Sequence, residues 1–179
     1  LFALIPMASE IAALGHRLDR IAGANRYFRD FTQNELTVAI REVIAGFPVY
    51  RTYVSPDTPA LAEKEEAYVR EAVALARRQT PTLKPEVFDF LRDALLLKLN
   101  PDPASEEAGL YRDFLMRFQQ LTGPIMAKGV EDTSFYVYNR LVSLNEVGGD
   151  HFYFGYSAKD FHRQNTRSHQ LWPGSLLAT

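Results

Sequence analysis

The stretch Thr32–Gly46, with the sequence TQNELTVAIREVIAG, decides the helical character of this chain. Thr32 and Glu35 have the spacing of a capping box. In this motif the threonine hydroxyl accepts from the amide of residue 35, and the glutamate carboxylate accepts from the threonine amide. The apolar residues that follow recur every three or four positions, which predicts a helix with one buried face. We expect Gly46 to lie just past the end of this helix and Pro48 to prevent its continuation.

The same helical period recurs on both sides of this stretch. It predicts further helices at about residues 5–22, 59–78, from 85 onward, 105–121 and 157–169. We expect Gly23 to end the first of them, and Thr122-Gly123-Pro124 to interrupt the pattern after residue 121. The predicted fold class is therefore mainly α, an irregular multi-helix bundle with one or two short strands.

The best strand candidate is Pro48–Val54, with the sequence PVYRTYV. It is rich in β-branched and aromatic residues, and it is short and bounded by turn-forming residues. In a strand Arg51 and Tyr53 would point to the same side, because side chains alternate with period two. A buried arginine needs a partner, and either a carboxylate or a ligand would serve.

Chain length and cysteine content limit the number of domains and the kinds of site that this chain can hold. A chain of 179 residues fits one domain. We expect a single helical subdomain over 1–179, with amphipathic helices and a short strand near 48–54 in 1–121, and a substrate-cleft motif, a loop and a final helix in 122–179. The chain has no cysteine, which rules out disulfides and thiolate metal sites.

Other features predict what the chain does not bind. The net charge of −2 shows no basic excess, so we expect no nucleic-acid partner. No apolar run approaches the roughly 20 residues of a membrane span, and we expect a cytoplasmic protein without a membrane partner. The sequence has no glycine-rich phosphate loop and no set of histidines at metal-ligand spacing, so we expect neither a cofactor nor a metal.

The segment from Lys128 to Arg140 is dense in charged and aromatic residues. On a helix Lys128 would share a face with Glu131 and with Asp132, at spacings of three and four. A patch of ammonium, carboxylate and aromatic groups suits a sugar, whose hydroxyls take hydrogen bonds and whose ring packs on aromatic faces. The alternative is a local ion pair above a buried aromatic cluster, and spacing alone favours that structural interpretation.

Several stretches of the sequence resemble the maltooligosyltrehalose synthase family, and together they span nearly the whole chain. The longest is RFQQLTGPIMAKGVEDTSFY at residues 117–136, continued by YNRL at 138–141 and SLNEVGGD at 143–150. RDFT at 29–32, FPVYRTY at 47–53, Trp172-Pro173 and Leu177-Ala178-Thr179 also look like that family.

The resemblance implies an enzyme of the α-amylase superfamily, built on a (β/α)8 barrel. Such an enzyme moves the reducing-end α-1,4 linkage of a maltooligosaccharide to an α,α-1,1 linkage by intramolecular transglycosylation, a step of trehalose biosynthesis. The implied mechanism is retaining, with an aspartate nucleophile, a glutamate acid/base and a second aspartate.

By the same resemblance the chain is expected to be a fragment, the helical insertion before the last catalytic-carboxylate motif. In the family a Ser-Thr-His-Asp motif with the third carboxylate follows Leu177-Ala178-Thr179, and the other two catalytic groups precede Leu1. We therefore expect no catalytic residue here, and a fragment that is inactive by itself. Its partners would be the maltooligosaccharide and the rest of the parent barrel.

The resemblance also assigns candidate substrate-binding residues. Lys128 and Glu131 match positions that contact the sugar near the cleavage point, while the family commonly has a basic residue where this chain has Val137. The full set of candidates is Lys128, Glu131, Asp132, Tyr136, Tyr138, Arg140, Asn145 and Glu146.

Two other functions remain open from the residues. One is a non-enzymatic helical protein-interaction module, in which the aromatic residues between 135 and 161 form an exposed patch. The other is a stand-alone glycan-binding domain, which would bind sugar as an isolated chain.

Overall fold

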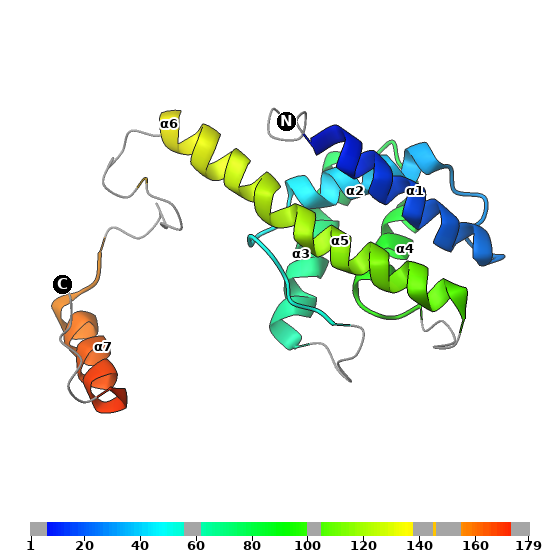
Figure 1. Cartoon of the computed structure of the whole chain (residues 1–179). Helices are drawn as coiled ribbons and strands as arrows, with labels where there is room; N and C mark the ends of the chain where they lie inside the picture. The colour runs from blue at the N-terminus through cyan, green and yellow to red at the C-terminus, as the bar shows by residue number, and fades with distance from the viewer. Residues whose placement is uncertain (1–6, 56–61, 100–104, 138–144, 146–154, 173–179) are drawn as a thin grey trace. The chain divides into compact units, whose positions relative to one another are not determined.

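The computed structural model describes residues 7–55, 62–99, 105–137, 145 and 155–172. These residues are mainly helical, as predicted, and include no strand. The chain divides into two compact units, 1–134 and 135–179. The helices are α1 (Ala8–Ala24), α2 (Gln33–Ala45), α3 (Glu63–Gln79), α4 (Pro85–Leu95), α5 (Glu106–Gly129), the π-helical turn η2 (Val130–Ser134), α6 (Phe135–Val137) and α7 (Ala158–Leu171), shown in Figure 1.

The capping box predicted at the start of α2 is confirmed. The Glu35 amide donates to the Thr32 hydroxyl at 3.2 Å, and the Thr32 amide donates to the Glu35 carboxylate at 2.9 Å. Gly46 is the residue that ends α2, but its φ of −100° is not left-handed. A Cβ at this position would lie 3.0 Å from the Leu75 side chain, so Gly46 serves the close approach of α3.

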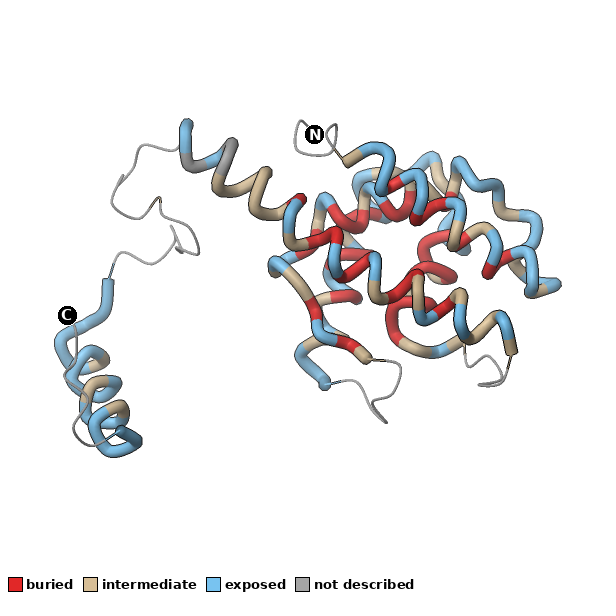
Figure 2. The backbone as a smooth tube through the Cα atoms, in the orientation of Figure 1, coloured by how far each residue is buried: buried red, intermediate tan, exposed pale blue. Residues whose placement is uncertain are grey.

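The core of the first unit fills the space between α1, α2, α3, α4 and α5 (Figure 2). Aromatic pairs run through it: Phe28 contacts Phe90 with ring centroids 4.5 Å apart, and Phe47 meets Phe118 edge-on at 5.8 Å. On α4 the apolar residues Val87, Phe88, Leu91 and Leu95 are all buried, because the 3.6-residue period places them on one side of the helix.

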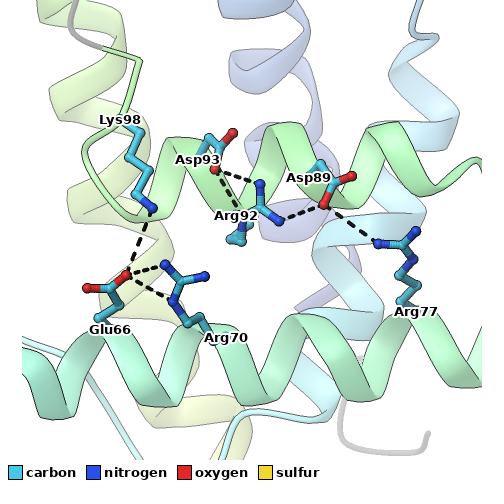
Figure 3. Close-up of polar contacts among 7 residues, drawn as sticks. All are labelled: Glu66, Arg70, Arg77, Asp89, Arg92, Asp93 and Lys98. Carbon is cyan, nitrogen blue, oxygen red and sulfur yellow. Dashed lines mark hydrogen bonds and ion pairs between the residues drawn. The ribbon is translucent and has the colours of Figure 1, made fainter.

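Charged side chains link α3 to α4 across the surface (Figure 3). Asp89 accepts from Arg92 at 2.7 Å and lies 3.7 Å from Arg77, while Glu66 pairs with Arg70. Such exposed pairs contribute about 0–1 kcal/mol each, so the helices are held mainly by the apolar core.

The strand predicted at Pro48–Val54 is wrong. Residues 48–54 form bends and extended chain, because none of the described residues supplies a neighbouring strand. A side chain takes that place: Val54 donates its amide to the Gln119 side-chain oxygen at 2.7 Å, and the Gln119 amide nitrogen donates to the Val54 carbonyl at 2.8 Å. Gln119 therefore completes both hydrogen bonds that a ladder partner would have made.

Two predicted helix ends are also wrong. α1 continues through Gly23 to Ala24, and α5 continues through Thr122-Gly123-Pro124 to Gly129. A proline inside a helix costs about 3 kcal/mol, since it removes one hydrogen bond and crowds the preceding turn. Burial of the neighbouring Leu121, Thr122 and Ile125 offsets that cost.

The second unit contains α7, whose predicted start at Ser157 is confirmed. The Asp160 amide donates to the Ser157 hydroxyl at 3.1 Å, which caps the helix. No residue of α7 is buried, and Phe161, Leu171 and the following Trp172 are all exposed. In the described part of the chain, none of the helices has the length and apolar character needed to cross a membrane.

Candidate functional site

The predicted residues Lys128 and Glu131 lie at the end of α5 and in η2. Glu131 contacts residues 47–55, a segment of bends and extended chain that we call the strap. The strap runs antiparallel to α5. Val54 bonds to Gln119, the Tyr50 carbonyl lies over Gly123, and the Tyr50 hydroxyl reaches Glu131.

Standard dimensions account for this reach. The Tyr50 carbonyl lies beside Gly123, and α5 and η2 rise by about 12 Å between 123 and 131. The side chains of Tyr50 and Glu131 together span that distance.

The strap is fixed at several points. Its first residue, Phe47, is buried against Phe118. The Tyr53 amide donates to the Glu65 carboxylate at 2.7 Å, at the start of α3. With the paired Gln119–Val54 bonds, these contacts hold the backbone of the strap on both sides of Tyr50.

Tyr50 is the residue that joins the strap to the candidate site. Its hydroxyl donates to a Glu131 carboxylate oxygen at 2.6 Å. This bond to the carboxylate, with some burial, raises the pKa of Tyr50 to about 12. The phenol therefore remains a hydrogen-bond donor at every pH near neutrality.

Lys128 lies in the last turn of α5, and both Lys128 and Glu131 are partly buried. A cation in that turn complements the helix dipole, which gives Lys128 a structural contribution of about 0.3–1 kcal/mol. The two side chains, three residues apart in the chain, supply ammonium donors and carboxylate acceptors. That combination suits a neutral ligand rich in hydroxyl groups, which donates and accepts in turn.

The π-helical turn η2 changes the spacing on which the sequence prediction relied. The Ser134 hydroxyl donates to the Gly129 carbonyl five residues earlier, at 2.9 Å. A wider turn rotates the residues after 130 relative to an ideal α-helix, so positions four apart no longer align on one face. Such turns occur frequently at functional sites.

Arg51 and Tyr53 lie together on the strap, as the alternation predicted. The Arg51 guanidinium stands 5.1 Å from the centroid of the Tyr53 ring. The carboxylate considered for this arginine is not found among the described residues: its Nε is buried there without a hydrogen-bond acceptor, and its contact is the aromatic face. Tyr53 itself is 76% exposed.

The remaining candidate residues are distributed as follows. Asp132 belongs to η2, Tyr136 is an exposed residue of α6 in the second unit, and Asn145 is partly buried. Tyr138, Arg140 and Glu146 lie outside the described residues. In the predicted aromatic patch, Tyr156 and Phe161 are exposed.

Sequence reasoning missed Tyr50 and Gln119, which have the most specific contacts near the site. Both partners are far away in the chain, by 81 residues for Tyr50 and Glu131 and by 65 for Gln119 and Val54. A buried glutamine in an apolar helix face was the available signal, because a buried amide side chain requires partners. Among the described residues no group of three or more histidine, aspartate or glutamate side chains could hold a metal ion.

Comparison with known proteins gives a partial match. No family model matches the chain, and no solved structure matches it significantly. A protein of Mycobacterium tuberculosis strain CDC 1551 / Oshkosh, named "Putative maltooligosyl trehalose synthase", is 51% identical over 61 residues. Its counterpart in strain H37Rv gives the same figures. The matched stretch is 34% of this chain and only 8% of the length of each relative. Over about a third of its length, this chain is therefore similar to proteins named as maltooligosyl trehalose synthases.

Proposed function

We propose that this chain is part of a maltooligosyltrehalose synthase and forms one wall of its sugar cleft. The identity of 51% over 61 residues to the two mycobacterial relatives carries the proposal. The motifs quoted above, including FPVYRTY at 47–53 and MAKGVEDTSFY at 126–136, support it over a longer part of the chain.

In this proposal the parent is a barrel enzyme of the α-amylase superfamily with a retaining mechanism. The catalytic carboxylates belong to the parent outside residues 1–179. The C1–O4 bond at the reducing end breaks, the released glucose turns while it is held, and its O1 forms the new bond to C1. Because no water is consumed, the product has the composition of the substrate and no reducing end.

Lys128 and Glu131 would hold hydroxyl groups of the sugar near the cleavage point. This role is supported by their partly buried positions, by their complementary donors and acceptors, and by the π-helical turn that contains Glu131 and directly follows the last turn of α5. A hydrogen bond to a charged group contributes about 1.5–3 kcal/mol, enough to affect retention of a released glucose.

The test is a reducing-end assay with maltopentaose. The full-length parent protein is expected to lower the number of reducing ends, whereas hydrolysis would raise it. The isolated chain of 179 residues is expected to leave the number of reducing ends unchanged. Turnover by the isolated chain would overturn the fragment role, and a parent that only hydrolyses would overturn the synthase assignment.

One observation favours a second function, a helical interaction module. Phe161, Leu171 and Trp172 are exposed at α7, and apolar side chains of that size are typical of interfaces. Size-exclusion chromatography against candidate partners, with maltooligosaccharide calorimetry in parallel, separates the two functions. Partner binding without any sugar turnover in the full-length protein would favour the module.

A further inference from the structure

We propose that Tyr50 is a positioning residue, whose hydroxyl orients the Glu131 carboxylate toward the hydroxyl groups of the bound sugar. This inference rests on the proposed function, because Glu131 is there the sugar contact. It adds a residue that neither the spacing within 128–140 nor the relatives' names assign.

The geometry begins with a side chain that needs orientation. Glu131 lies in the π-helical turn η2 and is partly buried, and a glutamate side chain can adopt several rotamers. Fixing a glutamate side chain costs rotamer entropy. A contact that exists before the sugar arrives removes part of that cost from binding.

Tyr50 provides such a contact from a rigid support. The bond from its hydroxyl to the carboxylate is 2.6 Å long, in the range of charge-assisted O–H···O bonds. Two chain segments 81 residues apart meet there. The backbone behind Tyr50 is itself held by Gln119 through Val54, so motion of the phenol is limited.

The hydrogen bond from Tyr50 also determines which sugar groups Glu131 can bind. A carboxylate offers roughly four lone-pair sites, and Tyr50 fills one of them with a donor. The directions of the remaining sites follow from that bond. Glu131 then acts as an acceptor toward a sugar O–H, while Lys128 supplies donors to sugar oxygens.

The experiment is a double-mutant cycle in the full-length protein, with the reducing-end assay as readout. Tyr50→Phe deletes only the hydroxyl, and Glu131→Ala removes its acceptor. The matched control is Tyr53→Phe, which deletes an exposed hydroxyl three residues along the same strap.

We expect Tyr50→Phe to lower kcat/KM about tenfold, the effect of one hydrogen bond to a charged group. In the Glu131→Ala background the same change is expected to have no further effect, whereas a merely structural role would persist there. Tyr53→Phe is expected to keep the wild-type rate. Because the phenol keeps its proton, the loss at Tyr50 should be constant from about pH 6 to 9.

The outcomes distinguish the positioning role of Tyr50 from the proposed function on which it rests. A normal rate in Tyr50→Phe, together with a loss in Glu131→Ala, would overturn the positioning role alone. Equal losses from Tyr50→Phe in both backgrounds would also overturn it. A normal rate in Glu131→Ala, or a parent without synthase activity, would overturn the proposed function first and this inference with it.

Discussion

Replacing Gln119 with leucine is expected to lower the free energy of unfolding by about 3 kcal/mol, although the two side chains are similar in size. Gln119 is only 1% exposed and makes both hydrogen bonds to the Val54 backbone. Leucine would leave a buried amide N–H and a buried carbonyl without partners, and each such group costs about 1–3 kcal/mol. In the variant the strap can move outward so that these two groups bond to water, which limits the total loss in the free energy of unfolding.

Urea unfolding measures this loss, and hydrogen exchange at the Val54 amide locates it. That amide is expected to exchange faster in the variant, because its acceptor is gone. The matched control is Gln120→Leu, the same change on the next residue of α5, which is exposed. We expect the control to lie within about 0.5 kcal/mol of the wild type. Equal stabilities for the two variants would show that Gln119 does not hold the strap.

The second large effect is expected at Gly15, where α1 crosses α2. A Cβ at this position would lie 2.0 Å from the Thr37 hydroxyl oxygen and 3.0 Å from the Thr37 Cβ. The Thr37 Cα would be 3.3 Å away, so rotation of the threonine side chain does not relieve the contact. The helices must separate, which costs about 3 kcal/mol. The better helix propensity of alanine offsets just under 1 kcal/mol, leaving a net loss of about 2.

Gly23→Ala is the matched control, within the same helix. A Cβ there has nothing within 4 Å, and the residue is exposed. Alanine is therefore expected to stabilise α1 by about 0.5–1 kcal/mol. Thermal unfolding of the two variants should give shifts of opposite sign. A gain in stability for Gly15→Ala would contradict the close crossing.

The helices were predictable because their signals are local. Thr32 and Glu35 set the start of α2 within four residues, and Ser157 does the same for α7. Pro85, in the first turn of α4, needs no amide donor there. None of these signals depends on the rest of the fold.

The strap was mispredicted for the opposite reason. Its composition favours a strand, but a strand forms only where a second backbone is available to pair with. Here the amide of Gln119 supplies the pairing, and no local pattern in residues 48–54 contains that information. In the same way, tertiary burial beside Pro124 overrides the tendency of proline to end a helix.

The candidate site was predictable in its residue types and less so in its geometry. Lys128 lies in the last turn of α5 and Glu131 in η2, and their convergence on one face stays a prediction. The π-helical turn after residue 129 has no sequence signature in the α-helical period, so the predicted alignment of the residues beyond it was not secure. The contact from Tyr50 depends on the path of the strap, which the sequence does not reveal.

The most direct test of the central claim is the rate at which full-length Lys128→Ala and Glu131→Ala variants turn maltopentaose into a non-reducing product. The matched controls are Glu63→Ala and Lys64→Ala, two exposed charges at the start of α3. If the end of α5 contacts the sugar, both site variants lose about tenfold in kcat/KM while they remain folded at the assay temperature, as the controls do. Wild-type rates in both site variants would contradict the account.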